Sequence, residues 1–297
     1  MSQQLTIAAH DHRFGWFMSA PAIAALLAVI LFPMFWALYT SVHEYTLIAP
    51  NFNTFTGTEN YFRTAGDAEF QHSLWLTLLF VVGVVALEFV VGFGVALMLN
   101  GVERFKSVYY GILLCPLLMN PVTVGLIWRM FLHPTLGIVN YLLGVVGIAP
   151  VNWLGSTSVA IWTVVMVDMW HQVSFMIVLL LAGLSALPRE PYEAARVDGA
   201  GAYRAFLHIT LPLMAPVIVV TLLIRTIFAV KTYDLIYIMT RGGPGVSTDF
   251  VSYFIYRTAF VSLNIGEASA MSAILLTLIL GLTIYLHRYM RSLSREL

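Results

Sequence analysis

Residues 74–99 read LWLTLLFVVGVVALEFVVGFGVALML, an apolar run that a single charged residue, Glu88, interrupts. About 20 consecutive apolar residues are enough for an α-helix to cross the hydrocarbon core of a bilayer. The run lacks the alternation of polar and apolar residues that is typical of a strand in a membrane β-barrel. Backbone polar groups in lipid need partners within the protein, and a helix supplies them within its own segment. Residues 74–99 are therefore predicted to form a membrane-spanning helix.

Five further runs have the same character, and each is predicted to be a transmembrane helix. They cover residues 14–41, 108–131, 159–187, 211–240 and 268–289. The first run is longer than the apolar core of a signal peptide, so we expect it to remain as the first span. The predicted fold class is an all-α integral membrane protein with six transmembrane helices.

The composition supports the same conclusion. Of the 297 residues, 60% are hydrophobic and 10% are charged, whereas about 25% of residues are charged in a typical soluble domain. A soluble domain of this length could not cover so much apolar surface, so membrane lipid is the expected environment. Lys and Arg together number 15, as do Asp and Glu, and the formal net charge is +0. This neutrality argues against a nucleic-acid partner.

The basic residues of the connections predict the orientation, because positively charged loops tend to stay in the cytoplasm. With the N-terminus inside, the inside connections hold Arg13, Arg104, Lys106, Arg189, Arg196, Arg204, Arg288, Arg291 and Arg295. The outside connections hold only Arg63, Arg241 and Arg257. We therefore expect both termini to be cytoplasmic, with residues 1–13 as a cytoplasmic N-terminal segment and residues 14–297 as the transmembrane domain. The loop of residues 188–210 is also expected in the cytoplasm.

The 188–210 loop reads PREPYEAARVDGAGAYRAFLHIT and is predicted to form two short helices around a turn. Ala194 and Ala195 favour a helix, and their small side chains let another surface approach closely. Gly199 and Gly201 allow the backbone to turn. The loop is therefore expected to be a rigid bend on the cytoplasmic face.

The spacing of residues in this loop resembles the EAA loop in permease subunits of binding-protein-dependent ABC importers. The residues that match are Glu193, Ala194, Ala195, Gly199, Ile209, Leu211 and Pro212. The resemblance implies a type I importer transmembrane fold, and it implies that the loop contains the coupling helix that docks in a groove of an ATPase subunit. An ordinary helical hairpin between two spans is the alternative.

Two further stretches resemble the sugar-type permeases of the maltose and glycerol phosphate families. They are residues 233–248, around the end of the predicted fifth span, and residues 266–270, at the start of the sixth. Glu267 stands where these permeases usually have an aromatic residue. The resemblance implies ATP-driven uptake of a carbohydrate or carbohydrate derivative by alternating access in the cell inner membrane. The implied partners are a second permease in a heterodimer, two ATPase subunits and an extracytoplasmic solute-binding protein.

The sequence gives no sign of catalytic machinery on this chain. A nucleotide-binding P-loop needs Gly-x4-Gly-Lys-Ser/Thr, and neither Lys106 nor Lys231 lies in such a sequence. The single cysteine, Cys115, excludes an internal disulfide, and the histidines lack metal-binding spacing. We therefore predict a transport subunit, not an enzyme, with no catalytic residue, metal or cofactor. ATP and Mg²⁺ are expected on the partner ATPase subunits.

Polar and aromatic residues within the fourth and fifth spans are candidates to line a solute path. Ionisable residues at membrane depth usually face a cavity or a partner helix, and a hydroxyl-rich solute suits polar groups and aromatic faces. The candidates are Asp168, Trp170, His171, Arg225, Lys231, Tyr233 and Asp234. In the alternative interpretation, Lys231 pairs with Asp234 on one helix face, and Asp168 and Arg225 bond to other helices.

Two other charges in the spans are expected to be structural. Glu88 is expected to bond within the helix bundle, and Arg129 is expected to reach outward toward the membrane surface. An ion-coupled secondary carrier is the alternative function, with Asp168, Lys231 and Asp234 carrying the coupling ion. The complete EAA pattern favours the ABC importer over this carrier.

Overall fold

The helices of the chain follow its apolar runs. The computed structural model describes residues 2–48, 50, 54–102 and 104–296, so the predicted domain ends at Met1 and Leu297 lie outside the described residues. The side chains of Arg13, Lys106, Arg291 and Arg295 also lie outside the described part. The elements are α1 (Ser2–Ser41), α2 (Glu59–Gly66), α3 (Ala68–Asn100), α4 (Lys106–Leu117), α5 (Pro121–Phe131), α6 (Ile138–Val145), α7 (Ala160–Ser185), α8 (Glu190–Val197), α9 (Ala202–Ala205), η1 (Phe206–Thr210), α10 (Leu211–Val230), α11 (Asp234–Met239), α12 (Val251–Tyr256), η2 (Arg257–Val261) and α13 (Ile265–Glu296).

The predicted all-α fold is confirmed for the part of the chain that the structure describes, where the remaining regular structure consists of two isolated β-bridges. Five stretches of described helix are long and apolar enough to cross a membrane. They are Met18–Ser41, Ala68–Asn100, Ala160–Ser185, Ala202–Val230 and Ile265–Tyr285. A sixth span is present if the bent pair α4 and α5 is counted as one.

The third predicted span, residues 108–131, is wrong as a single straight helix. α4 and α5 meet at an angle of 90° across a short break. The Oδ1 atom of Asn120 accepts a hydrogen bond of 2.9 Å from the backbone N–H of Val122, and Pro121 occupies the first turn of α5. An Asn cap followed by Pro is a helix start, so the chain begins a new helix within the apolar run.

The fifth predicted span, residues 211–240, also has different limits. α9, η1 and α10 run on as one helix of residues 202–230, and the helix ends before Lys231. A separate short helix, α11, begins at Asp234. Lys231 and Asp234 therefore do not share a helix face, and no salt bridge joins them in the described structure. The alternative interpretation, in which their three-residue spacing pairs them on one helix face, is wrong.

The chain forms two compact units, and the smaller contains residues 2–66 and 257–276. In this unit, polar groups at the end of α1 have partners in α2 and α13. The hydroxyls of Thr40 and Ser269 lie 2.9 Å apart, and those of Ser41 and Tyr61 lie 2.7 Å apart. The side-chain amide of Asn60 donates a hydrogen bond of 2.9 Å to the carbonyl of Ser41. These hydrogen bonds give the polar groups at the end of α1 their partners, and they attach this end to α2 and α13.

Glu267, the residue that departs from the sugar-type pattern, lies in the same unit. Its Oε2 atom accepts a hydrogen bond of 2.7 Å from the side-chain amide of Asn264. Its other oxygen lies 3.8 Å from Nε of Arg63 on α2. Glu267 thus makes polar contacts at the start of α13 in place of the packing that an aromatic side chain would make.

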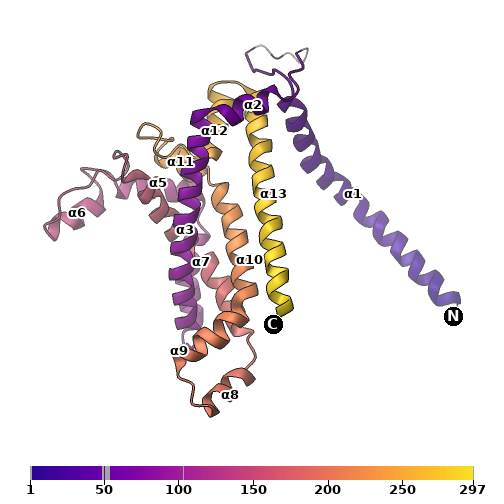
Figure 1. Ribbon diagram of the computed structural model, residues 1–297, viewed down its shortest axis with the longest axis vertical. Coiled ribbons are helices and arrows are strands. Elements are labelled where there is room, and N and C mark those ends of the chain that lie inside the picture. The colour runs from indigo at the N-terminus through magenta and orange to yellow at the C-terminus, as the bar shows by residue number, and fades with distance from the viewer. Residues whose placement is uncertain (1, 49, 51–53, 103, 297) are drawn as a thin grey trace. The chain divides into compact units, whose positions relative to one another are not determined.

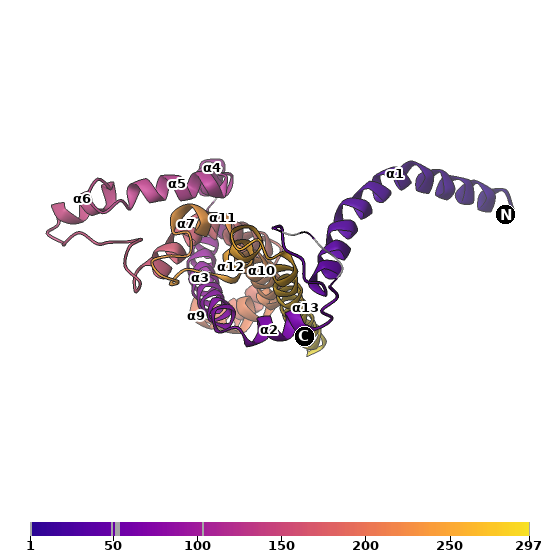
Figure 2. The same cartoon turned by 90° about the horizontal axis from the view of Figure 1, so that it is seen from above.

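The larger unit contains residues 67–256 and 277–296. Within it, α3, α7 and α10 run side by side (Figure 1), and α4, α5 and α6 extend to one side of these helices (Figure 2). α3 and α7 approach closely at Gly92, where a Cβ atom would lie 2.9 Å from Cγ of Met176. Small residues permit such approaches in membrane proteins, where van der Waals packing drives helix association.

The buried apolar side chains of the larger unit form two clusters, one toward each end of the helices. The first includes Phe80, Val84, Val164, Val167, Ala229 and Ile236. The second includes Phe93, Ala96, Met176, Leu180, Leu184 and Met214. Along each of α3, α7 and α10, a short stretch separates the two clusters.

Candidate functional site

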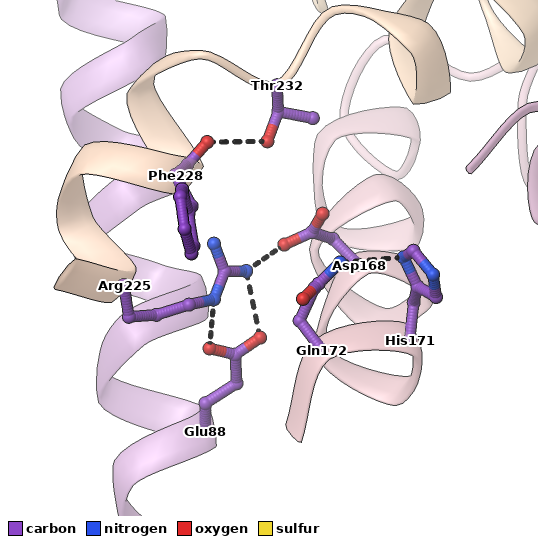
Figure 3. A network of polar contacts seen from close by, with 7 residues as sticks. All are labelled: Glu88, Asp168, His171, Gln172, Arg225, Phe228 and Thr232. Carbon is purple, nitrogen blue, oxygen red and sulfur yellow. Dashed lines mark hydrogen bonds and ion pairs between the residues drawn. The ribbon is translucent and has the colours of Figure 1, made fainter. Parts of the chain in front are cut away.

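The side chains of Arg225, Glu88 and Asp168 point toward one another (Figure 3). Along their helices, these residues lie between the buried members of the two apolar clusters. The Nε and Nη2 atoms of Arg225 on α10 donate hydrogen bonds of 2.5 and 2.9 Å to the two carboxylate oxygens of Glu88 on α3. Nη2 of Arg225 also donates to Oδ2 of Asp168 on α7. The exposed fractions of Arg225, Glu88 and Asp168 are 1%, 0% and 4%. One side chain from each of the three packed helices therefore contributes to a single ion network.

The arrangement explains why these charges are tolerated at membrane depth. A planar guanidinium matches a carboxylate with two parallel hydrogen bonds, which are stronger than bonds between neutral groups. Removing one partner from a buried ion network costs about 3–5 kcal/mol, because an uncompensated charge remains. The network therefore holds α3, α7 and α10 in one register. Glu88 bonds within the bundle, and Asp168 and Arg225 bond to other helices.

His171, another predicted path residue, is also buried within this chain. Its Nε2 atom lies 3.1 Å from the carbonyl oxygen of Met119, in the break between α4 and α5. A carbonyl only accepts, so the proton lies on Nε2, and Nδ1 accepts a bond of 3.1 Å from the side-chain amide of Gln172. His171 thus connects α7 to the bend between α4 and α5. Because their polar groups are engaged, Asp168, His171 and Arg225 have less access to a solute than the exposed candidates have.

The exposed candidates are Trp170, Lys231 and Asp234, and Tyr233 is half-buried. Tyr233 belongs to a group of four tyrosines with Tyr237, Tyr253 and Tyr256, whose ring centroids lie 4.9–6.4 Å apart. Sequence reasoning identified only Tyr233 in this group. The spacing of Tyr233 and Tyr237, four residues apart around α11, was the available signal for the second tyrosine.

Arg129 lies on α5, and its Nη1 atom donates a hydrogen bond of 3.2 Å to the carbonyl of Ile238 on α11. The side chain is exposed, as the sequence predicted, but it also fixes α5 against α11. Gly125 permits this contact, because a Cβ atom there would lie 3.0 Å from Cγ2 of Ile238.

The 188–210 loop forms two helical segments around a turn, as predicted. α8 carries Glu193, Ala194 and Ala195, and none of its residues is fully buried. After α8, the backbone N–H of Gly199 bonds to the carbonyl of Arg196 at 3.1 Å, and that of Ala200 bonds to the carbonyl of Ala195 at 2.8 Å. This pair of bonds is the Schellman arrangement that ends many helices.

Gly199 has a φ of +72°, and no atom lies within 4 Å of where its Cβ would be. The left-handed backbone conformation, and not lack of space, therefore requires glycine there. Gly201 also has open space around it, but its φ of −70° suits any residue. The two glycines that looked alike in the sequence thus have different roles.

The second segment of the loop joins the bundle. η1, a π-helical turn, continues into α10, and the ring of Phe206 packs in a tilted arrangement against that of Phe93 of α3, with ring centroids 5.9 Å apart. Leu211 packs against the second apolar cluster, and Ile209 and Pro212 are half-buried. The predicted loop residues therefore separate into an exposed group on α8 and an anchoring group at the start of α10.

A cleft of about 530 Å³ lies beside α8. It is lined by the ends of α3 and α7, including Leu97 and Leu184, and by Tyr192 and Glu193 of α8. Val197 projects from α8 with 88% of its surface exposed. Sequence reasoning did not single out Val197, although an apolar residue beside the turn was the available signal. α8 thus presents Ala194 and Val197 to the surroundings together with the charged side chains of Glu190, Glu193 and Arg196.

The family model described as "Binding-protein-dependent transport system inner membrane component" matches residues 88–295. The trehalose/maltose transport system permease protein MalF of Thermococcus litoralis is 36% identical over 277 residues, which cover 92% of each chain. The sulfoquinovosyl glycerol transport system permease protein SmoG of Agrobacterium fabrum is 35% identical over 282 residues, covering 95% of this chain and 92% of that one.

Two solved structures have the same fold. One is a bacterial ABC transporter involved in the import of the acidic polysaccharide alginate, with a TM-score of 0.84, 21% identity, and coverage of 97% of this chain and 99% of that one. The other is a bacterial alginate ABC transporter in complex with an alginate pentasaccharide-bound periplasmic protein, with a TM-score of 0.82, 22% identity, and coverage of 96% and 97%.

Proposed function

Because the chain belongs to the family of inner membrane components of binding-protein-dependent transport systems, we propose that it imports a carbohydrate or carbohydrate derivative by ATP-driven alternating access. It is a multi-pass permease subunit of the inner membrane with the ABC importer fold. The finer proposal concerns three points: how energy enters the chain, what the solute is, and which subunits assemble with it.

The observation that carries the proposal is the structure of α8. Glu193 and Ala194 are exposed, Ala195 is half-buried, and Gly199 ends the helix with its left-handed conformation. A short helix with two adjacent alanines and no buried residue is free to dock in a groove of another protein. This is the role that the EAA pattern implies, with energy passing from a partner ATPase to the permease through α8.

The proposed solute class rests on two observations. The related permeases are named for trehalose, maltose and sulfoquinovosyl glycerol, which all contain sugar rings. Exposed Trp170, Lys231 and Asp234, with half-buried Tyr233, offer an aromatic face and charged groups to a hydroxyl-rich solute. The half-buried Tyr237 and Tyr256 beside Tyr233 give this region further aromatic surface.

The proposed assembly contains this chain, a second permease in a heterodimer, two ATPase subunits that bind ATP and Mg²⁺, and an extracytoplasmic solute-binding protein. The binding protein delivers solute to the outer side. ATP-driven closure of the ATPases brings the two coupling helices together and opens the permeases outward. Hydrolysis and release restore the inward-open state, and the solute enters the cell.

Reconstitution in proteoliposomes tests the proposal. The reconstituted complex contains this chain, its partner permease, the ATPase and the binding protein. Radiolabelled trehalose, maltose and sulfoquinovosyl glycerol are tested as solutes. The complex is expected to take up one of them, and only when ATP is supplied to the ATPase. A complex with an inactive ATPase is the control. Uptake driven by a proton or sodium gradient without nucleotide would contradict the proposal and support the ion-coupled carrier.

A further inference from the structure

The attachment of α8 to the rest of the loop depends on one side-chain contact. The hydroxyl of Tyr192, in the first turn of α8, lies 3.0 Å from Oγ1 of Thr210, the last residue of η1. Among the residues that the structure describes, this is the only hydrogen bond between a side chain of α8 and another element. Thr210 is buried, so its hydroxyl has little access to water as an alternative partner.

The remaining connections of α8 leave its rotation about its own axis weakly fixed. The cleft of about 530 Å³ lies between α8 and the ends of α3 and α7, so this side of α8 lacks close packing. The chain joins α8 to α7 through residues 186–189 and to α9 through a turn that contains Gly199 and Gly201. Two chain connections near the ends of a helix still allow it to rotate about the line between them. A third attachment, the Tyr192–Thr210 bond, removes that freedom.

Thr210 is well placed to transmit a movement of α8 to the rest of the bundle. It lies in the continuous helix of α9, η1 and α10, and that helix carries Arg225. Arg225 binds Glu88 on α3 and Asp168 on α7. A displacement that enters the helix at Thr210 therefore reaches a residue that is bonded to both of its neighbouring helices.

We propose that the Tyr192–Thr210 hydrogen bond fixes the rotation of α8 about its own axis relative to the α9–η1–α10 helix, so that movement imposed on α8 is passed to α10. Tyr192 is then a positioning residue for coupling, and Thr210 is its partner. This inference rests on the proposed function, because it assumes that an ATPase moves α8. Loss of the bond leaves the docking residues of α8 intact but lets α8 turn without moving α10.

The first test measures solute imported per ATP hydrolysed in proteoliposomes that contain the whole complex. Tyr192→Phe and Thr210→Val are each expected to lower this ratio about fivefold, the factor that corresponds to one neutral hydrogen bond, while ATP hydrolysis continues. Thr210→Ser keeps the hydroxyl and is expected to keep the wild-type ratio. The double variant Tyr192→Phe/Thr210→Val is expected to be no worse than either single variant, because both remove the same bond.

Tyr203→Phe is the matched control, because Tyr203 lies in the same loop with 74% of its surface exposed, and it is expected to keep the wild-type ratio. A wild-type ratio in Tyr192→Phe would overturn the inference while leaving the proposed function intact. Absence of ATP-driven uptake by the wild-type complex would instead contradict the proposed function.

A second measurement does not depend on transport. Spin labels are attached at Val197→Cys on α8 and at Val220→Cys on α10, in a Cys115→Ser background. Double electron–electron resonance then measures the distance between the two labels. The distance distribution is expected to be narrow in the wild-type loop and in Thr210→Ser, and to broaden in Tyr192→Phe. An equally narrow distribution in Tyr192→Phe would show that the bond does not fix α8 and would overturn the inference.

Discussion

The ion network of Glu88, Asp168 and Arg225 and the 188–210 loop are built in opposite ways. The network is fully enclosed within the larger unit, and hydrogen bonds join its members across three helices. In the loop, α8 has no fully buried residue and borders a cleft. Many neighbouring residues fix the position of the ion network. A backbone turn and one side-chain hydrogen bond fix the position of α8.

The difference teaches where function is to be sought in this chain. Charged residues at membrane depth attract functional interpretations, yet here they are engaged with one another and hold helices together. The 188–210 loop packs less tightly than the network, and it carries the EAA pattern. Sparse packing leaves the surface of α8 free for a partner, as the proposed docking role requires.

The largest effect is expected when the ion network is disrupted. Arg225→Met leaves the carboxylates of Glu88 and Asp168 buried without their cation, and it is expected to lower the free energy of unfolding by about 3–5 kcal/mol. The measurement is denaturant or thermal unfolding of the purified protein in detergent.

The matched control for that change is the triple variant Glu88→Gln/Asp168→Asn/Arg225→Met, which removes all three charges together. It is expected to recover much of the lost stability, because no charge remains unpaired. Wild-type stability of the Arg225→Met single variant would show that the network does not hold the helices.

The next effect concerns packing around the network. In Gly92→Ala, the new Cβ atom would lie 2.9 Å from Cγ of Met176, so α3 and α7 must separate or Met176 must move. We expect a loss of about 1–3 kcal/mol in the free energy of unfolding. Gly94→Ala, two residues along α3 with open space around it, is expected to be neutral. Equal stability of the two variants would contradict the close contact.

A smaller effect tests whether the backbone turn matters in the loosely packed loop. Gly199→Ala must adopt a φ of +72°, which costs an alanine about 1–2 kcal/mol, and the end of α8 is expected to rearrange. ATP-driven uptake in proteoliposomes is expected to fall about tenfold. Gly201→Ala, at a φ of −70°, is expected to transport normally. Normal transport by Gly199→Ala would argue against the turn.

The smallest effect concerns the free surface of α8. Val197→Ser removes exposed apolar surface that docking would bury, and it is expected to weaken the affinity for the ATPase subunit by about 1 kcal/mol. Val146→Ser is the control, because it makes the same substitution at another exposed valine, beside the end of α6. Unchanged affinity in a pull-down or calorimetric titration would exclude Val197 from the docking surface.

Hydropathy and local pattern predicted most of the helices and the loop, because both are properties of short stretches. The break within the third span was missed because averaging over an apolar run hides the helix start at Asn120 and Pro121. The Lys231–Asp234 pair failed because the spacing argument assumed a continuous helix, and the helix stops at Val230. Local sequence carries little information on such an interruption inside an apolar region.

The ion network could not be assigned from the sequence for a different reason. Arg225 lies 137 residues from Glu88 and 57 residues from Asp168 along the chain, so the pairs are set by how helices pack. The sequence showed that each charge needed a partner, because an unpaired charge at membrane depth is poorly solvated. It did not show which residue the partner is. The Tyr192–Thr210 bond is similar, because it depends on the angle between two helices.

The order of the network along the chain has a consequence for biogenesis. During synthesis, α3 and α7 emerge before α10, so Glu88 and Asp168 are made long before Arg225. A nascent chain that has not yet reached α10 must therefore place two acidic groups in or near lipid without their counter-ion. Completion of α10 then supplies the counter-ion, so a chain truncated upstream of α10 keeps both carboxylates without the guanidinium that binds them.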